Sequence, residues 1–206
     1  MTLTFRIQLR HIQKPPVWRK VVIPASFTFA KLHETIQEAF GWTYSHLYQF
    51  QHHPYDGGWA VKDPNAIEVE KDSWIGKRDD ESYNAEKTVV AKFLHDKGLD
   101  KFVYVYDFGD DWIHDITLEA TDEKEELIHP VCLAGKGACP PEDCGGPWGY
   151  EDIKQLFAEH PDSDEARSYK EWMFMDEEDE FDPKYFDIDE VNEALMDVQM
   201  GKDIHS

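Results

Sequence analysis

FVYVYDFGDDWIHDITLE, residues 102–119, is the stretch of sequence that decides the fold. Valine alternates with tyrosine along residues 103–106, and apolar side chains alternate with mostly polar ones along residues 112–119. A period of two is typical of paired β-strands. Residues 107–111 separate the two runs and supply Gly and Asp, which favour a tight reversal. The stretch therefore predicts a β-hairpin with a polar tip.

The start of the chain predicts another hairpin, followed by a helix and a third strand. Residues 2–12 alternate between apolar and polar side chains, and residues 17–23 form a second run of β type. Thr28 fits a helix N-cap, and Gly41 stands where the apolar face of that helix ends. Because residues 46–52 alternate again, the chain is expected to open in the order β-β-α-β.

The remainder of the chain predicts a connection and a group of helices. Residues 54–86 carry weak signals and predict a long surface connection with a short strand at residues 67–69. Three helices are expected near the C-terminus. The first has Glu151 in its opening turn, and Asp162 and Asp187 cap the other two.

These elements together predict a single α+β domain over residues 1–206. We expect a mostly antiparallel, mixed sheet of about five or six strands, a β-grasp-like core in the β-β-α-β opening, and a C-terminal helical layer. The chain is 41% hydrophobic and 14% aromatic, which is ample for a packed core.

Charge is distributed unevenly along the chain. The formal net charge is −22; residues 1–60 contain six Lys/Arg against three Asp/Glu, whereas residues 61–206 contain fifteen against forty. An acidic surface repels phosphate groups, so direct nucleic-acid binding is not expected. Three cysteines without a signal-peptide pattern indicate a reducing, cytoplasmic compartment. No apolar run is long enough to predict a membrane span.

A group of acids and a histidine is the first candidate site. The hairpin supplies Asp107, Asp110 and His114, and the Cys/Pro/Gly loop at residues 132–150 supplies Glu142 and Asp143, with His46 as a further candidate. Carboxylates and imidazole can hold a divalent ion while leaving a position for water, as in a metal-dependent hydrolase. The alternative is that these acids bond backbone amides at turns and cap the following helix.

A second candidate site is a structural zinc centre. Its ligands would be His129, Cys132, Cys139 and Cys144. The alternative is that the thiols are small buried hydrophobes, because no Cys-x2-Cys pair is present. We also expect the hairpin tip and the Cys/Pro/Gly loop to touch, with Trp112 and Trp148 burying their rings nearby.

Basic residues mark the first hairpin. These residues predict a solvated strand face, and they are Arg6, Arg10, Lys14, Arg19 and Lys20.

Several short segments occur in an order that is shared with a known family. They are Pro15–Arg19, Leu32–Trp42, Ser45–Phe50, Tyr106–Asp110, Cys132–Gly135, Cys139–Tyr150, Phe181–Pro183 and Phe186–Asp187. On these segments the chain resembles the plasmid pRi Orf-three-like family nearly end to end. The resemblance implies a single α+β domain and an association with mobile elements; it carries over no activity.

Two functional hypotheses follow from the sequence. No nucleophile–base pair, phosphate loop or cofactor fingerprint is present, which favours a binding or accessory module with a protein or small-molecule partner. The other hypothesis is a metal-dependent hydrolase that uses the carboxylate and histidine group. A concave pocket at the hairpin tip would favour the hydrolase, and a flat apolar patch would favour the binding module.

Overall fold

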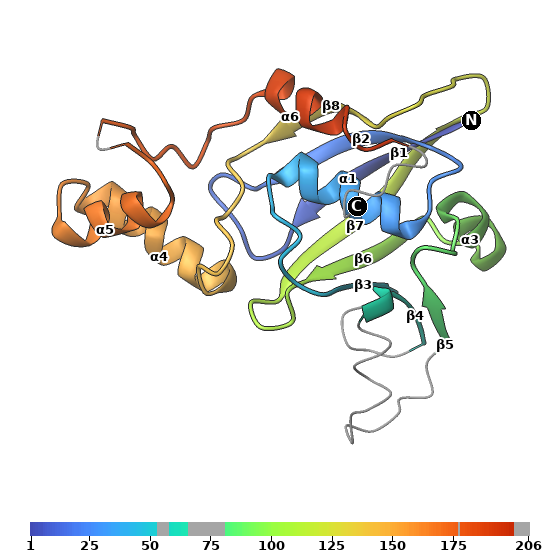
Figure 1. Cartoon of the computed structure of the whole chain (residues 1–206), viewed down its shortest axis with the longest axis horizontal. Helices are drawn as coiled ribbons and strands as arrows, with labels where there is room; N and C mark the ends of the chain where they lie inside the picture. Colours follow the sequence, from blue (N-terminus) through green and yellow to red (C-terminus); the bar gives the residue numbers. More distant parts are fainter. Residues whose placement is uncertain (53–57, 66–80, 177, 200–206) are drawn as a thin grey trace.

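The structure is a computed structural model that describes residues 1–52, 58–65, 81–176 and 178–199. Its sheet runs in the order β5-β4-β3-β6-β7-β1-β2-β8, and only the β4–β5 pair is parallel. The strands are β1 (Thr2–Leu9), β2 (Trp18–Pro24), β3 (Tyr48–Gln51), β4 (Trp59–Lys62), β5 (Glu81–Asn84), β6 (Lys101–Tyr106), β7 (Trp112–Asp122) and β8 (Val131–Lys136). The helices are α1 (Phe29–Phe40), α3 (Val90–Lys97), α4 (Gly146–Glu159), α5 (Asp164–Trp172) and α6 (Ile188–Leu195). Figure 1 shows their arrangement.

The predicted fold class is confirmed, and the sheet is larger than expected. Eight strands form it among the described residues, instead of five or six. Two of the additional strands, β4 and β5, lie in the stretch that was expected to be a surface connection, and β8 lies at the start of the Cys/Pro/Gly loop. The strand expected at residues 67–69 lies outside the described residues.

Both predicted hairpins are present. β1 pairs with β2 from Thr2↔Pro24 to Gln8↔Trp18, and β6 pairs with β7 up to Tyr106↔Trp112. β1 also pairs with β7, which joins the two hairpins edge to edge. The alternating residues of β7 that face the core are buried, as the period-two pattern predicts.

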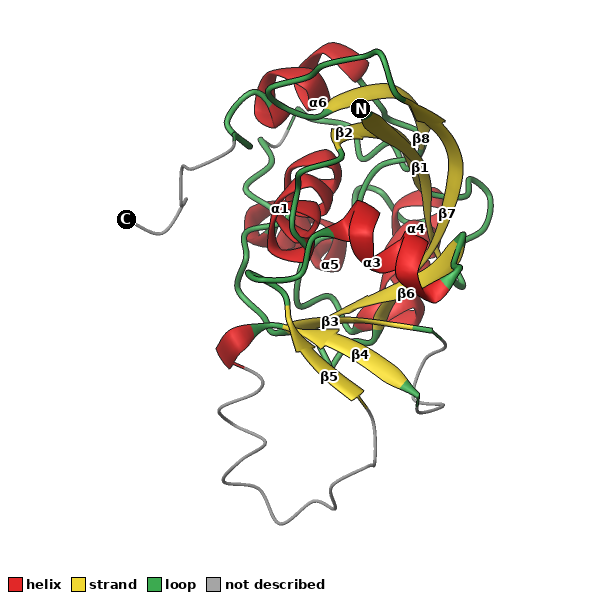
Figure 2. Cartoon of the chain, turned by 90° about the vertical axis from the view of Figure 1, so that its right-hand side faces the viewer, coloured by secondary structure: helices red, strands yellow, loops and turns green. Residues whose placement is uncertain are grey.

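The helix α1 forms where its capping residues predict. The Thr28 side chain accepts a hydrogen bond from the Lys31 backbone N–H at 3.3 Å, and Gly41 adopts a left-handed φ of 80° that ends the helix. Leu32 and Ile36 are fully buried on the face toward the sheet. Figure 2 shows the sheet curving around α1, so this helix forms the centre of the core.

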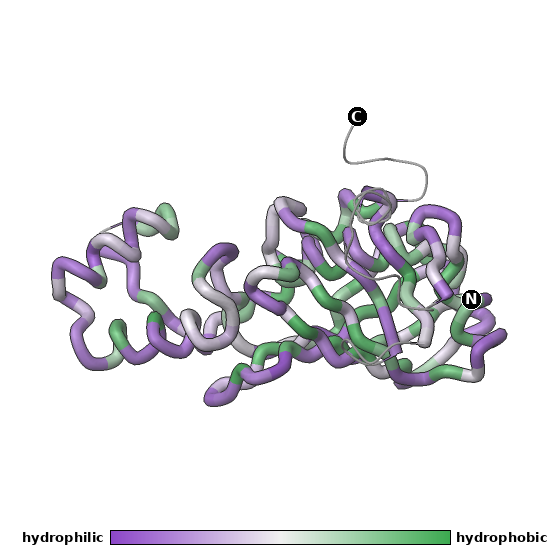
Figure 3. Tube along the Cα trace, turned by 90° about the horizontal axis from the view of Figure 1, so that it is seen from below, coloured by the Kyte–Doolittle hydropathy of each residue, from purple (hydrophilic) through white to green (hydrophobic). Residues whose placement is uncertain are grey.

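The last helices occupy two places. α6 packs against α1 and β8, and Asp187 caps it as predicted. α4 and α5 extend to one side (Figure 1) and share a small core of Ile153, Phe157 and Ala166. Figure 3 shows that hydrophobic segments gather in the sheet-bearing body, whereas this extension is mainly hydrophilic.

Several details of the helical predictions were wrong. α4 begins at Gly146, so Glu151 lies beyond its first turn, and Ser163 caps α5 in place of Asp162. Trp148 is 75% exposed, because it lies on the outer side of α4. No described helix has the length and apolar character needed to cross a bilayer.

The prediction that the basic residues of the first hairpin lie on a solvated strand face was wrong for Arg19. Arg19 is only 4% exposed and points toward the C-terminal end of α1. Its guanidinium donates to the carbonyl oxygens of Ala39, Trp18, Lys136 and Gly137 at 2.9–3.1 Å. Burial lowers the pKa of Arg19. The carbonyl bonds compensate its desolvated charge and join β2 to α1 and to the end of β8.

Candidate functional site

Strand pairing brings the first two residues of the site together. His46 lies just before β3, and Asp107 follows β6. Because β3 and β6 are antiparallel, with Tyr48 opposite Tyr106, both residues lie where these two strands meet at the same end. The Asp107 backbone N–H donates to the Leu47 carbonyl at 3.1 Å, which extends the pairing by one step.

The Cys/Pro/Gly loop delivers the third residue, Asp143. Gly145 N–H donates to Asp110 Oδ2 at 3.1 Å, and Trp42 Nε1–H donates to the Pro140 carbonyl at 2.9 Å. The first bond seats the loop on the tip of the β6–β7 hairpin, and the second joins the loop to the segment between α1 and β3. The prediction that the two segments touch is confirmed.

His46, Asp107 and Asp143 form a compact triad. One ligand atom of each lies within 4.8 Å of the other two. His46 Nε2 is 3.2 Å from Asp143 Oδ1 and 3.7 Å from Asp107 Oδ2. The Asp107 side chain is nearly buried and the His46 side chain is half-buried, whereas Asp143 faces solvent. The triad is therefore open on the side of Asp143.

The backbone at the two aspartates is unusual. Asp107 and Asp143 adopt left-handed φ values of 55° and 57°. Aspartate tolerates this region better than most residues, but the surrounding structure must still hold it there. At Asp107 this is done in part by Oδ1, which accepts a hydrogen bond from Gly109 N–H at 2.9 Å and leaves Oδ2 directed at His46.

Glu142 and Asp110 position the loop and do not join the triad. Glu142 accepts from the Thr43 backbone N–H at 3.1 Å and from the hydroxyl groups of Thr43 and Tyr106. Burial and the bond to Glu142 raise the pKa of Tyr106, so the phenol remains a neutral donor. Both carboxylates accept hydrogen bonds from backbone amides of neighbouring segments, as the alternative interpretation of the sequence expected.

His114 is a core residue and does not reach the triad. It is fully buried on the face of β7 that covers α1, edge-to-face with Phe40 at 5.0 Å and Trp42 at 5.2 Å between ring centroids. Its Nδ1–H donates to the Trp112 carbonyl at 3.0 Å. Burial lowers the pKa of His114 to about 3, so the imidazole is neutral.

Comparison with known proteins identifies the family of the chain. Residues 1–190 match the family described as "Plasmid pRiA4b ORF-3-like protein". The chain belongs to this family. "Uncharacterized protein y4hQ" of Sinorhizobium fredii (strain NBRC 101917 / NGR234) is 33% identical over 193 residues, which cover 94% of this chain and 90% of that protein.

A solved structure confirms the shared architecture. The crystal structure of "Protein of Unknown Function MM3350" from Methanosarcina mazei Go1 matches with a TM-score of 0.68 and 28% identity, over 91% of this chain and 96% of that one. The family match over residues 1–190 confirms the resemblance that was drawn from short segments.

The predicted zinc ligands are not brought together in this ORF-3-like fold. Cys132 lies in β8 with its thiol directed at the Ala134 carbonyl at 3.4 Å, and His129 Nδ1–H donates to the Pro130 carbonyl at 3.0 Å. Cys144 lies in the loop, where burial raises its pKa to about 12. Cys139 lies in the same loop, and burial raises its pKa as well.

Within the part of the chain that the structure describes, His46, Asp107 and Asp143 are the one group of three with converging ligand atoms. The Cys and His spacing is close in sequence, but Cys132 is buried within β8 and its thiol donates to the Ala134 carbonyl.

The sequence signalled this site incompletely. It singled out Asp107 and Asp143, but grouped them with His114 and kept His46 as a further candidate. His46 was expected at the start of a strand, whereas β3 begins at Tyr48 and leaves His46 in the preceding turn. The signal that could have found it is the antiparallel pairing of β3 with β6, because that pairing places residue 47 opposite residue 107 and residue 46 one position further along.

Proposed function

We propose that this family member is a binding module that takes a divalent cation at His46, Asp107 and Asp143. The observation that carries the proposal is the convergence of one imidazole nitrogen and two carboxylate oxygens from three separate loops. His46 Nε2 is buried and makes no hydrogen bond, although it faces both carboxylates. A nitrogen placed in this way is suited to accept a metal ion.

The donor set favours particular ions. A mixture of imidazole and carboxylate suits Mn²⁺, Fe²⁺, Co²⁺ or Zn²⁺ better than Ca²⁺, which prefers oxygen ligands alone. Three protein ligands leave further coordination positions for water or for a group supplied by a partner. The side of Asp143 is the open side, so a partner would approach the ion there.

A proton is the competitor of the metal ion at this site. When His46 is protonated, Nε2–H faces Asp143 and Asp107 as an ion pair at 3.2 and 3.7 Å. A metal ion requires the lone pair of the unprotonated nitrogen, so metal affinity should fall as the pH is lowered. Competition between a proton and the metal ion distinguishes binding at His46 from loose attraction of a cation to the acidic surface.

Metal-dependent hydrolysis is the alternative, and it needs a substrate cleft beside the metal. Hollows of 140 and 210 Å³ lie along α5, and none of the three triad residues lines either one. Both are below the range of about 300–1,000 Å³ that is usual for small-molecule sites. Neither of these hollows provides a substrate cleft at the triad, so we favour the binding module. The plasmid in the family's description supports an accessory role in mobile elements.

Calorimetric titration of Mn²⁺ and Zn²⁺ into protein purified without a histidine tag tests the proposal. We expect one equivalent to bind, with an affinity that falls at lower pH because a proton competes for the imidazole nitrogen. His46→Ala or Asp143→Asn should weaken binding at least about tenfold, since each removes a ligand atom.

Two control variants make the titration specific. Asp111→Asn removes a carboxylate of the same hairpin tip that lies outside the triad, and Cys132→Ser removes a thiol of the predicted zinc set. Both should bind metal as the parent does. Equal affinity in the parent and His46→Ala would refute the triad, and loss of binding in Cys132→Ser would point to the sulfur ligands instead.

A further inference from the structure

The outer face of α5 carries an aromatic surface that the fold does not cover. Trp172 is 41% exposed, and its ring lies 6.0 Å from that of half-buried Tyr169. A hollow of 210 Å³ beside them is lined by Glu165, Ser168, Tyr169 and Trp172, which are spaced i, i+3, i+4 and i+7 on one side of the helix. We call Glu165, Tyr169, Trp172 and the following Phe174 the α5 face.

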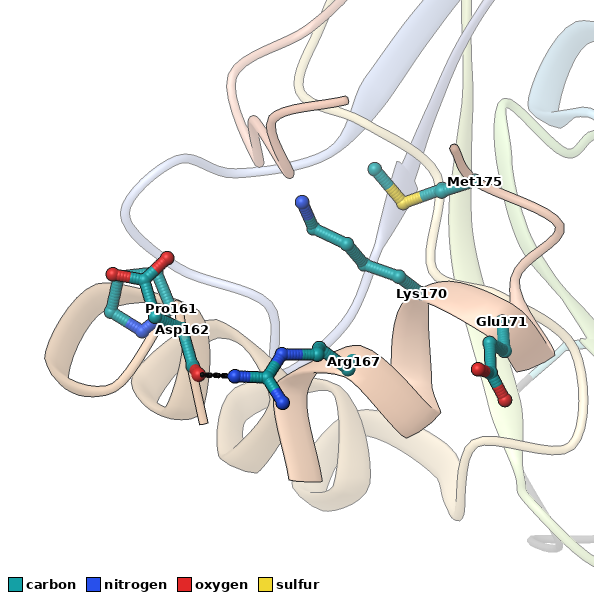
Figure 4. A pocket seen from close by; sticks show the side chains of 6 residues that line it. All are labelled: Pro161, Asp162, Arg167, Lys170, Glu171 and Met175. Carbon is teal, nitrogen blue, oxygen red and sulfur yellow. Dashed lines mark hydrogen bonds between the residues drawn. The ribbon is translucent and has the colours of Figure 1, made fainter. Parts of the chain in front are cut away.

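The opposite side of α5 is directed at its own neighbouring loops. A hollow of 140 Å³ there is lined by Pro161, Asp162, Arg167, Lys170, Glu171 and Met175. Figure 4 shows Arg167 bonded to the Asp162 carbonyl, a contact of 2.8 Å, and Lys170 extending toward Met175. The polar side of the helix thus contacts neighbouring loops. On the other side, Tyr169 packs partly against the small core shared with α4, and Trp172 faces outward.

Phe174 lies at the end of this face in a conformation that packing does not explain. Its φ is 56°, a left-handed value that is costly for a bulky side chain, and its side chain is 97% exposed. The bend is held by a hydrogen bond of 2.9 Å from Met175 N–H to the Lys170 carbonyl. Because the ring is outside the described core, its burial in this chain cannot offset the cost.

The charge around the α5 face is strongly negative. Residues 159–182 contain eleven Asp/Glu and two Lys/Arg. Both cations are engaged within the extension: Arg167 pairs with Asp164 at 2.6 Å, and Lys170 Nζ donates to the Asp179 carbonyl. A second copy of this chain, with a net charge of −22, would be repelled, as would nucleic acid. The charge is complementary to a basic protein segment.

We propose that the α5 face is the docking site for a basic, amphipathic segment of a protein partner. An apolar side chain of that segment enters the hollow beside Trp172, and its Lys or Arg side chains pair with Glu165 and with the other acids around the face. Exposed aromatic residues are common anchors of such interfaces, and complementary charge steers the encounter. The inference is independent of the cation site.

Fluorescence anisotropy with a labelled peptide of alternating Arg and Leu tests the proposal at about 150 mM salt, where long-range attraction is screened. The parent should bind this peptide and not a matched peptide of alternating Glu and Leu. Trp172→Ala and Phe174→Asn should each weaken binding about tenfold. Phe174→Asn should also unfold at or above the parent's denaturant midpoint, because Asn tolerates the left-handed region, so its loss of binding cannot come from misfolding.

Matched variants separate docking from general attraction. Trp148→Ala removes another exposed tryptophan, and Glu123→Gln combined with Glu126→Gln lowers the negative charge elsewhere on the surface. Neither should change the affinity more than twofold. An equal loss in these variants would overturn the proposal, as would absence of binding by the parent up to about 1 mM. A Trp172→Ala variant with a smaller solution mass than the parent would also overturn it, since the occupant would then be a second copy.

Discussion

At the scale of single residues, burial decides chemistry that the sequence leaves open. Trp112 is fully buried as its alternation predicts, but the same pattern places His114 on the covered face. Arg19 was expected in solvent and is 4% exposed. Alternation shows which residues of a strand share a face. It does not show that distant segments, here the end of α1 and Phe186, will cover that face.

His114 should make the stability of the protein fall with acidity. Its pKa is lowered to about 3 by burial, so between its ordinary pKa of 6.5 and that value the unfolded chain binds a proton that the folded chain does not. Stability therefore falls as the pH drops through this window. When the pH is lowered from about 7.5 to about 5, the free energy of unfolding measured in urea should fall by about 2 kcal/mol less for His114→Gln than for the parent. Parallel pH profiles would show that His114 is not desolvated.

Arg19→Lys should destabilise the fold although it keeps the charge. The guanidinium donates to four carbonyl oxygens, a geometry that a single ammonium group cannot reproduce. We expect a loss of about 2–4 kcal/mol in the free energy of unfolding. Arg10→Lys is the control, because Arg10 pairs with Asp115 at the surface and should lose less than about 1 kcal/mol. Similar losses in the two variants would contradict the role given to Arg19.

At the scale of elements, the sequence predicted the helix ends that are fixed by residues close to them in the chain. The caps of α1 and α6 are made by residues within a few positions, and both were readable from the sequence. The start of α4 was not, because Gly145, Gly146 and Pro147 resemble a loop and the contact that holds them comes from the hairpin tip. The short strands β4 and β5 form through their neighbours, without an alternating pattern of their own.

Gly146→Ala should weaken the cation site without removing a ligand. A Cβ at Gly146 would lie 2.4 Å from the Asp110 carbonyl oxygen, so the loop would have to move off the hairpin and carry Asp143 away from His46. We expect metal affinity to fall about tenfold or more in calorimetry.

Gly145→Ala is the matched control. Its φ of 88° is equally unfavourable for alanine, but its Cβ would meet no atom closer than 3.8 Å. It should lose stability and keep most of its metal affinity. The Gly146 account would be contradicted by equal metal affinities in the two variants.

At the scale of the whole molecule, the site is a product of topology. Residues 46, 107 and 143 lie on three loops that are far apart in sequence, and the strand order of the sheet brings these loops together beside the ends of β3 and β6. The fold class and the family could be predicted because they rest on patterns spread along the chain. The ligand set could not, because spacing in sequence does not measure convergence in space: in the described residues, His129 and the three cysteines form no converging group of ligand atoms.

Anomalous diffraction from crystals grown with Mn²⁺ or Zn²⁺, recorded at the absorption edge of the metal, tests the cation site most directly. An ion bound at the triad should give a peak bounded by His46 Nε2 and one carboxylate oxygen each of Asp107 and Asp143, about 2.0–2.2 Å from each ligand atom. His46→Ala crystals should lack that peak. A peak among Cys132, Cys139 and Cys144, or none beside His46 in metal-loaded crystals, would contradict the account.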